Sequence, residues 1–357
     1  MKHISVIGIA GLPAKYGGFE TLVENLTKYL SYKHNITVFC SSKIYSEKIK
    51  KYNNVNLKYI SLKPNGVQSI FYDIISIFYS LKFADTLLIL GVSGAVILPF
   101  IKIFSRKKII VNIDGLEWKR DKWGVFSKLF LKFSEKIAVK YSDVVIADNK
   151  SIQEYVFNEY KKKSTLIAYG GDHAKKEIVT DCLKDRYQFL NKKYAFNVCR
   201  IEPENNIDMM LEAFTEYGKM NFIIIGNWVN SVYGNKLREK YSNVKNIFLL
   251  DPIYDQNVLN QIRSNCYIYI HGHSAGGTNP SLVEAMHLGL PIFSYSAEYN
   301  KNTTMNKALY FSNKEELIDL LLTVSDKYIK SIAINMKLIA NDEYNWEQIS
   351  TKYSNLF

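Results

Sequence analysis

The chain has little cysteine and little proline. Its 357 residues include 4 cysteines and 7 prolines. The cysteines lie far apart, without the spacing of a metal site, and each is in or beside an apolar stretch: Cys40, Cys182, Cys199 and Cys266. We therefore expect buried free thiols, which fit a reducing cytosol, and no metal site built on cysteine.

Long apolar runs are also missing. A long uncharged and apolar stretch, 86–101, is interrupted by Gly91, Ser93 and Gly94. It is too short to span a membrane and is more typical of a strand, a turn and the start of a helix. The opening MKHISVIGIAG enters a strand pattern directly, without the cleavage pattern of a signal peptide. We expect a protein that is not integral to a membrane.

Acidic residues are scarce in the first half only. Residues 1–180 hold 28 Lys and Arg against 15 Asp and Glu, an excess of 13, whereas residues 181–357 hold 18 against 19. The whole net charge of +12 thus comes from the first half. This asymmetry predicts that the first half faces something anionic and the second half does not.

What the chain does have is an alternation of short apolar strands and helical segments. A composition of 47% hydrophobic and 14% aromatic residues is typical of a globular protein. Strands separated by helices predict parallel sheets with helices on both faces. The pattern stops in a polar stretch near 172–192 and then starts again, which predicts two doubly wound, Rossmann-like α/β domains. We place them at 1–175 and 190–335, and expect a last helix, 336–357, to pack back on the first domain.

The segment 267–286, YIYIHGHSAGGTNPSLVEAM, is the most informative. An apolar strand leads into a glycine loop, and Asn279-Pro280 supplies an N-cap followed by proline at the first helical position. Unpaired backbone N–H groups and the helix dipole then point at one place, which favours phosphate. Glu284 lies one turn further in, and helical side chains lean toward the N-terminus. Its carboxylate can therefore reach a group bound beside the cap, as the ribose of a nucleotide would be. An ordinary strand–helix turn with a solvated glutamate is the alternative.

Further loops follow other predicted strands. In doubly wound sheets, ligands bind beyond the carboxyl ends of the strands. Two domains that face one another would bring these loops into one central cleft. The loops are GLPAKYGGFE (11–20), DGLEWKRDKWG (114–124), YGGD (169–172), CRIEPENN (199–206) and the segment described above.

On the strings YGGFE (16–20), NIDGLEWKRDKWG (112–124) and GGTNPSLVEAM (276–286), the chain resembles the GT-B glycosyltransferases of family 4. The first two strings look like a bacterial subgroup of rhamnosyltransferases that build surface polysaccharides. The resemblance implies a sugar nucleotide on the second domain and an acceptor on the first. It also implies retention of the anomeric configuration, with no metal and no other cofactor.

The resemblance implies which residues of this chain form the donor site, and two positions differ from the family's pattern. Glu284 matches the carboxylate that holds the ribose, but Gly276 stands where a second carboxylate, for the donor sugar, is usual. Arg200 matches the arginine of the diphosphate clamp, but Asn205 stands where its lysine is usual. A donor site with one polar side chain fewer agrees with a sugar that has one hydroxyl fewer, such as the 6-deoxy sugar rhamnose. Further donor-site residues are expected at Gly17, Gly18, Gly277, Thr278 and Asn279.

The expected chemistry follows from charge. Breaking the sugar–phosphate bond leaves negative charge on the diphosphate, so Arg200 and donors at the helix start lower the barrier. Asp114, which ends the predicted strand 108–114, is assigned to orient the acceptor hydroxyl or help its deprotonation, with a turn-capping role as the alternative. Asp114, Arg200 and Glu284 are thus the expected catalytic residues. The expected acceptor residues are Glu117, Trp118, Arg120, Asp148 and Tyr169. His271 and His273 either touch the donor or are hydrogen-bonded core residues.

The basic first half also mixes lysine with aromatic and aliphatic residues, as in IKIFSRKK (101–108) and 118–140. Cationic amphipathic surface suits anionic lipid headgroups and a polyprenyl-diphosphate acceptor. The alternative is that these residues are core and solvated surface. Nucleic-acid binding is the competing use of positive charge, but no recognisable module is present.

Taken together, these features predict a retaining hexosyltransferase that moves L-rhamnose from dTDP-rhamnose to a polyprenyl-diphosphate-linked saccharide. It would serve capsule, O-antigen or cell-wall polysaccharide assembly, peripherally bound to the cytoplasmic face of the membrane. One alternative keeps the reaction with a UDP-hexose donor. Another is a degenerate, non-catalytic module that binds a nucleotide sugar. A sugar-nucleotide epimerase shares the architecture, but GGTNPSLVEAM fits a transferase better.

Overall fold

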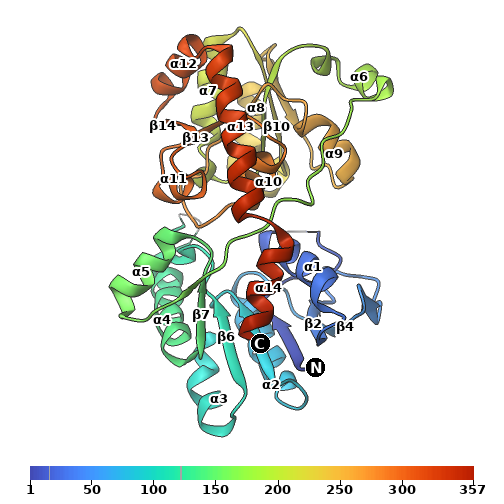
Figure 1. The fold of residues 1–357 in the computed structure, drawn as a ribbon, viewed down its shortest axis with the longest axis vertical. Coiled ribbons are helices and arrows are strands. Elements are labelled where there is room, and N and C mark those ends of the chain that lie inside the picture. The colour runs from blue at the N-terminus through green and yellow to red at the C-terminus, as the bar shows by residue number, and fades with distance from the viewer. Residues whose placement is uncertain (16, 121–122) are drawn as a thin grey trace. The chain divides into compact units, whose positions relative to one another are not determined.

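The computed structural model describes residues 1–15, 17–120 and 123–357. Two compact units make up the chain (Figure 1): unit 1 is Met1–Tyr169 with Trp346–Phe357, and unit 2 is Gly170–Asn345. The return to unit 1 comes at Trp346 rather than at the predicted 336. The reason is that α13 (Asp326–Glu343) packs on α10 (Pro280–His287) of unit 2, with Met336 and Ala340 fully buried.

Unit 1 is built on an eight-stranded sheet, counted over the described residues, with the order β3-β4-β2-β1-β5-β6-β7-β8. All pairings are parallel except that of β3 with β4. The strands are β1 (His3–Ile7), β2 (Asn35–Ser41), β3 (Lys51–Tyr52), β4 (Val55–Ile60), β5 (Thr86–Leu90), β6 (Lys108–Asn112), β7 (Val144–Ala147) and β8 (Thr165–Leu166). The uncharged run 86–101 becomes β5, a turn and the start of a helix, as predicted.

The helices of unit 1 divide between the two faces of this sheet. The strands up to β4 are added toward one edge of the sheet, and the strands from β5 on are added toward the other edge. Right-handed crossovers therefore put α1 on one face of the sheet and α2 to α5 on the other. The last helix, α14, packs against α1. The helices are α1 (Gly18–Leu30), α2 (Val67–Ser80), η1 (Ala95–Ile97), α3 (Leu98–Phe104), η2 (Glu117–Lys119), α4 (Val125–Tyr141), α5 (Lys150–Tyr160) and α14 (Trp346–Leu356).

Unit 2 repeats the architecture with a six-stranded sheet over the described residues, in the order β11-β10-β9-β12-β13-β14, and all its pairings are parallel. The strands are β9 (Tyr194–Val198), β10 (Asn221–Ile225), β11 (Ile247–Leu250), β12 (Ile268–His271), β13 (Ile292–Tyr295) and β14 (Leu309–Phe311). Besides α10 and α13, the helices are α6 (Asp181–Arg186), η3 (Gln188–Asn191), η4 (Pro203–Asn205), α7 (Ile207–Tyr217), η5 (Trp228–Asn230), α8 (Val232–Tyr241), α9 (Gln256–Arg263), α11 (Glu298–Thr303) and α12 (Lys314–Thr323).

The central strands of each sheet are buried on both faces, which explains why they are continuous apolar runs, whereas β4 near the edge of the sheet in unit 1 alternates between buried and exposed residues. Ile89 and Val111 are fully buried in the core of unit 1, and Phe222 and Ile270 are fully buried in that of unit 2. The polar loops that the sequence singled out follow β1, β6, β9 and β12. They therefore lie at the carboxyl ends of the strands, which is where ligands bind in such sheets.

The cysteines are free, but the prediction that all are buried was wrong. Cys40 and Cys266 are buried, Cys199 is half-buried, and Cys182 is exposed because α6 is a short surface helix. Over the described residues, no three His, Cys, Asp or Glu side chains gather closely enough to hold a metal ion. Within the same residues, no helix combines the length and the apolar character that crossing a membrane needs.

Candidate functional site

The loop between β12 and α10 has the capped helix start that the sequence predicted. The side chain of Asn279 accepts a hydrogen bond from the backbone N–H of Ser281 at 3.0 Å, and Pro280 is the first helical residue. The glycine loop before the cap has Gly276 at φ +140°, where a residue with a Cβ is strained. Gly277 and Thr278 are buried beside it. Backbone N–H groups thus gather at the start of α10, which suits an anion.

Glu284 is held by an arginine and a histidine that the sequence did not point to. The buried Arg263, at the end of α9, forms an ion pair with Oε2 of Glu284, and Nε2 of His173 lies 2.9 Å from Oε1. Burial would raise the pKa of Glu284, but the charge of Arg263 and the contact with His173 outweigh it and lower the pKa to about 2. Glu284 is therefore ionised at all ordinary pH values and fixed in orientation.

Asn205, at the position of the missing lysine, joins two loops of unit 2. It is buried in η4, where its Nδ2 donates to the carbonyl of Arg200 at 2.7 Å and its Oδ1 lies 2.8 Å from Nδ1 of His273. Ser274 adds a second link, because its backbone N–H donates to the carbonyl of Glu204 at 2.7 Å. The loop after β9 and the loop after β12 are thus fastened together. Arg200 itself has an exposed side chain beside this junction.

The first glycine loop, between β1 and α1, contains a carboxylate of its own. Oε1 of the buried Glu20 accepts the backbone N–H of Ala10 at 2.7 Å, and a Cβ on Gly17 would lie only 2.9 Å from Oε2. Burial raises the pKa of Glu20, although backbone hydrogen bonds from Ala10 and Gly17 oppose the shift. Gly17 and Gly18, expected to approach a diphosphate, therefore stand next to a carboxyl group of their own helix.

Asp114 stands two residues beyond the end of β6 and not at the end of a strand. Its φ of +62° is left-handed, and its backbone N–H donates to Oδ1 of Asn112 at 3.0 Å. Nδ2 of Asn112 in turn donates to the hydroxyl of Tyr353 on α14 at 3.1 Å. It is therefore Asn112 that caps this turn, and α14 supports it.

Asp114, Asp148 and Tyr169 come together in unit 1. Asp148 and Tyr169 are both buried. Burial raises the pKa of the Tyr169 hydroxyl, and the carboxylates of Asp114, Asp148 and Glu20 raise it further. Three of the sequence-predicted residues, with Glu20 added, therefore share one neighbourhood beyond the carboxyl ends of the strands.

Glu117, Trp118 and Arg120 form a second group, in and beside η2. Arg120 makes an ion pair with Glu117 at 2.8 Å. The ammonium of Lys132 lies 4.6 Å from the centre of the Trp118 ring. Glu117 also accepts a hydrogen bond from the indole N–H of Trp123 at 3.1 Å. Each of the three residues thus makes a structural contact in addition to the acceptor role predicted for it.

Sequence reasoning missed Glu20, His173 and Arg263. Glu20 ends the string YGGFE, and His173 directly follows YGGD, so both had a weak local signal. Arg263 had none, because its contact with Glu284 joins two residues that are 21 positions apart in the chain. His271 is buried, and burial lowers its pKa to about 3, but its Nε2 has no hydrogen-bond partner among the described residues. The interpretation of His271 as a hydrogen-bonded core residue is therefore not confirmed.

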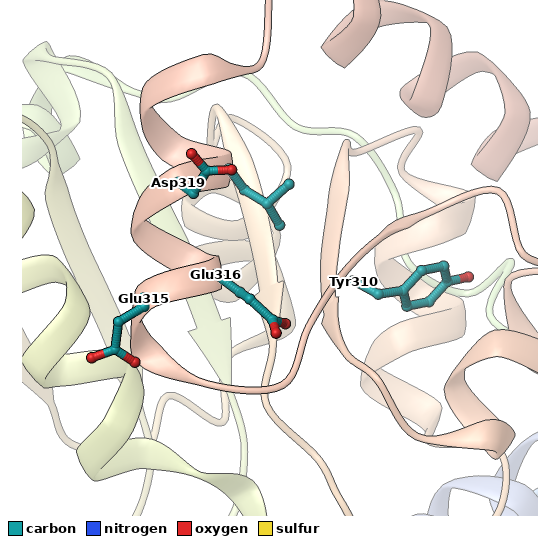
Figure 2. Close-up of a pocket in the computed structure, with 5 residues that line it drawn as sticks. Tyr310, Glu315, Glu316 and Asp319 are labelled. Atoms are coloured by element: carbon teal, nitrogen blue, oxygen red, sulfur yellow. The ribbon is translucent and has the colours of Figure 1, made fainter.

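A pocket of about 470 Å³ lies elsewhere in unit 2, between β14 and α12 (Figure 2). It is lined by Tyr310, Glu315, Glu316, Asp319 and Leu320. Glu316 is part of a helix start, since it accepts the backbone N–H of Ser312 at 2.7 Å, while its own N–H donates to Asn313 at 2.8 Å. Three carboxylates would repel a diphosphate, so this pocket is not the candidate donor site.

Two family descriptions match the chain. "Glycosyl transferases group 1" matches residues 181–329, and "Domain of unknown function (DUF1972)" matches residues 1–172. The chain contains a glycosyl transferases group 1 domain. This domain includes Arg200, Asn205, Arg263 and the whole segment from the glycine loop to Glu284.

Relatives agree with this domain assignment. An uncharacterized glycosyltransferase of Methanocaldococcus jannaschii is 22% identical over 393 residues, which cover 100% of this chain and 99% of the relative. A probable sucrose-phosphate synthase of Thermosipho melanesiensis is 25% identical over 242 residues, which cover 62% of this chain and 56% of the relative. One of these two relatives is named as a glycosyltransferase, and the other as a probable sucrose-phosphate synthase.

Solved structures confirm the predicted α/β fold with parallel sheets. Sucrose-phosphate synthase from Thermosynechococcus elongatus has a TM-score of 0.83 at 14% identity, covering 100% of this chain and 98% of its own. HepE of Anabaena, in complex with UDP-glucose, has a TM-score of 0.78 at 13% identity, covering 99% of this chain and 98% of its own. The chain therefore has the two-sheet α/β fold of these GT-B structures.

Proposed function

We propose that the chain is a retaining hexosyltransferase that moves L-rhamnose from dTDP-rhamnose to a polyprenyl-diphosphate-linked saccharide. The donor binds unit 2, the acceptor binds unit 1, and neither a metal nor another cofactor takes part. The product serves capsule, O-antigen or cell-wall polysaccharide assembly in a bacterium, at the cytoplasmic face of the membrane. The likeness of YGGFE and NIDGLEWKRDKWG to bacterial rhamnosyltransferases supports the choice of sugar and pathway.

The observation that carries the proposal is the ionised Glu284 one turn inside the capped start of α10. Helix-start N–H groups attract the diphosphate of a sugar nucleotide, whereas an ionised carboxylate accepts hydrogen bonds from the ribose hydroxyls. Arg263 and His173 hold both carboxylate oxygens, so little rotamer entropy is lost when the nucleotide binds. An ordinary solvated glutamate would lack these partners.

The proposed reaction proceeds on one face of the sugar. The bond from the anomeric carbon to the diphosphate oxygen breaks, and a bond from that carbon to the acceptor oxygen forms on the same face. The acceptor proton passes to the departing phosphate, so no enzymic nucleophile is needed. Arg200 and the N–H groups at the start of α10 stabilise the charge on the leaving diphosphate. Asp114 orients the acceptor hydroxyl.

We further propose that the outer surface of α2, α3 and α4 rests on an anionic lipid surface. Phe71, Ile75 and Phe78 recur at helical spacing on α2 and are all exposed, and Phe126, Leu129 and Phe133 do the same on α4. Phe104 of α3 is 82% exposed. Lys136 and Lys140 continue the spacing of the α4 residues and are exposed. Aromatic residues next to lysines suit the boundary between headgroups and acyl chains.

The test of the reaction incubates the protein with radiolabelled dTDP-rhamnose or UDP-glucose and a synthetic polyprenyl-diphosphate sugar, without added metal. We expect label in the lipid fraction from dTDP-rhamnose only. Glu284→Gln should reduce the rate at least about 100-fold, because the neutral amide loses the charge-assisted contact with the ribose. An unchanged dependence on donor concentration in this variant would remove Glu284 from the donor site.

The membrane proposal is tested with vesicles. We expect the protein to sediment with anionic vesicles at low salt, and Phe104→Ser with Phe126→Ser to weaken sedimentation without lowering the thermal midpoint of unfolding. Equal sedimentation of the variant, or none of the wild type, would contradict docking by this surface.

A UDP-hexose donor is the second candidate, and the structure of HepE with UDP-glucose favours it. Transfer from UDP-glucose alone would decide for this donor while keeping the reaction class. A third candidate, a non-catalytic binding module, is favoured by Gly276 and Asn205, which depart from the expected pattern. Tight binding of sugar nucleotides without transfer to any acceptor would decide for it.

A further inference from the structure

The first and last segments of unit 2 are hydrogen-bonded to each other and to α10. Unit 2 begins at Gly170 and ends at Asn345. The carbonyl of Tyr344 accepts the backbone N–H of Gly171 at 2.9 Å, and Nε2 of His287 lies 2.8 Å from the same oxygen. Because a carbonyl can only accept hydrogen bonds, Nε2 of His287 is the donor. We call Gly171, His287 and the carbonyl of Tyr344 the end clamp.

Close packing fixes the end clamp against α10. A Cβ on Gly171 would lie 2.6 Å from the backbone oxygen of Val283 and 2.8 Å from Cδ2 of His287, so only glycine lets this segment approach the helix so closely. Tyr344 directly follows α13, which packs on α10 (Figure 1). The hydroxyl of Tyr344 also donates to the carbonyl of Thr303 at 2.8 Å. Both segments that form the clamp are therefore held in place.

A tight turn leads from the end clamp to His173. The N–H of Ala174 donates to the carbonyl of Gly171 at 3.0 Å, so His173 is one of the two central residues of this turn. The position of His173 thus depends on where Gly171 is held. From the turn, Nε2 of His173 reaches Oε1 of Glu284 at 2.9 Å. Since Glu284 and His287 are three positions apart on α10, they lie on one face of the helix, and the segment 171–173 contacts both.

We propose that Gly171 and His287 are positioning residues for the nucleotide of the donor. They hold the turn 171–174 so that His173 meets Glu284, and Glu284 binds the ribose. Neither Gly171 nor His287 is assigned to touch the nucleotide. This inference rests on the proposed function, because it needs a nucleotide at Glu284. By reciprocity, a bound nucleotide stabilises the end clamp by the same factor by which the clamp strengthens nucleotide binding.

Isothermal titration calorimetry of the whole chain with UDP and dTDP measures the effect of the clamp on nucleotide affinity. For whichever nucleotide the wild type binds more tightly, we expect His287→Phe and Gly171→Ala each to weaken binding about threefold to tenfold, the effect of one lost hydrogen bond. His287→Phe keeps a ring in place but cannot donate to Tyr344. Tyr217→Phe is the matched control, because it also removes one donor to a backbone carbonyl of unit 2, that of Leu321, and keeps its ring. The control should stay within about twofold of the wild type.

A double-mutant cycle shows whether the end clamp acts through His173. In the background His173→Ala, the changes His287→Phe and Gly171→Ala should alter the affinity by less than about twofold, because the contact that they position is already missing. Effects that stay as large in this background would show a general loosening of unit 2, and the proposal would be wrong. If Gly171→Ala does not fold, the cycle with His287→Phe decides alone.

Hydrogen exchange measures the reverse effect, that of the nucleotide on the clamp. Mass spectrometry of a short peptide that contains residues 170–174 follows the N–H of Gly171. In the wild type, saturating nucleotide should slow the exchange of this N–H about threefold to tenfold, by the factor found in calorimetry. In His173→Ala, saturating nucleotide should slow it by less than about twofold. Equal slowing in both proteins would mean that the nucleotide acts on the clamp by another route, which contradicts the proposal.

The outcomes separate this proposal from the proposed function. If Glu284→Gln weakens nucleotide binding while His287→Phe and Gly171→Ala keep the affinity of the wild type, the donor site stands and this inference is wrong. If the wild type binds UDP and dTDP no better than it binds inorganic phosphate, the proposed function fails and takes this inference with it. The test requires binding only, so it also applies to a non-catalytic protein.

Discussion

Units 1 and 2 place a glutamate in the same kind of motif and give it opposite electrostatics. In both units a parallel strand leads through a glycine loop into a helix that carries a buried or nearly buried carboxyl group. Burial raises the pKa of Glu20 in unit 1, and the opposing contacts are backbone hydrogen bonds. Burial also acts on Glu284 in unit 2, but Arg263 and His173 outweigh it and lower the pKa to about 2.

The net charge of the two halves would predict the opposite order of the two pKa values, because a positive surrounding lowers the pKa of a carboxyl group. The first half of the chain has an excess of 13 basic residues, yet it contains the carboxyl group that is harder to ionise. The second half is nearly neutral and contains the one that is always ionised. One guanidinium in contact therefore matters more than many lysines that are solvated and screened. The comparison shows that the contacts of each carboxyl group, and not the net charge of its half of the chain, set its pKa.

Removing Arg263 should have a large effect on stability at neutral pH, because it leaves Glu284 without its main cation. We expect Arg263→Met to lower the free energy of unfolding by about 3 kcal/mol. The folded-state pKa of Glu284 lies below its unfolded value, so its stabilisation is present above about pH 4.5 and disappears as the pH falls toward 2. The variant should lack this acid-dependent loss, which urea unfolding between pH 2.5 and 7 measures. Arg238→Met, which breaks an exposed pair with Asp251, should change stability by less than about 0.5 kcal/mol.

Asp73 tests whether burial also controls the pKa of a second carboxyl group in unit 1. Asp73 of α2 is buried, which raises its pKa to about 8 even though the backbone N–H of Gly94 opposes the shift. Because the folded-state pKa is the higher one, stability should fall as the pH rises from about 5 to 8, by up to about 1.4 kcal/mol per pH unit. Asp73→Asn should flatten this slope in urea unfolding. An equally steep slope in the variant would show that other groups cause it.

Gly17 tests the contact between the first glycine loop and Glu20. Gly17→Ala places a methyl group 2.9 Å from Oε2 of Glu20, so the carboxyl group must move, and we expect a loss of about 1 to 2 kcal/mol in unfolding free energy. Gly124 also precedes a helix with an extended backbone, but nothing lies within 4 Å of its Cβ position. Gly124→Ala should therefore be close to neutral. Equal losses in the two variants would mean that the Glu20 contact contributes nothing.

The two asparagine caps give the smallest and most closely matched comparison. Asn279 of unit 2 and Asn149 of unit 1 each accept the N–H of a serine two residues on, at 3.0 Å. Replacing either with alanine should cost about 1 kcal/mol of stability. Only Asn279→Ala should also weaken nucleotide binding in calorimetry, because only that helix start is assigned to the diphosphate. Weaker binding in Asn149→Ala alone would reverse the assignment of the units.

Much of the donor segment could be predicted from local sequence. The strand, the glycine loop, the Asn279 cap and the first helical Pro280 are consecutive residues whose conformations depend mainly on their own side chains. The predicted strand 108–114 was too long because Asn112 captures the N–H of Asp114 and turns the chain early. The end of unit 2 was also missed, because the register of α13 on α10 depends on which buried residues fit together.

The order of apolar and polar residues was sufficient, by itself, to determine two parallel α/β sheets with glycine loops at the ends of their strands. This is because periodicity and helix caps act over a few neighbouring residues. Tertiary packing alone decided the ion pair of Glu284 with Arg263 and the contact between Asn205 and His273. Arg263 is 21 residues from Glu284, and Asn205 is 68 residues from His273. Contacts at such separations form only when the sheet brings its strand ends together, and no local pattern in the chain records them.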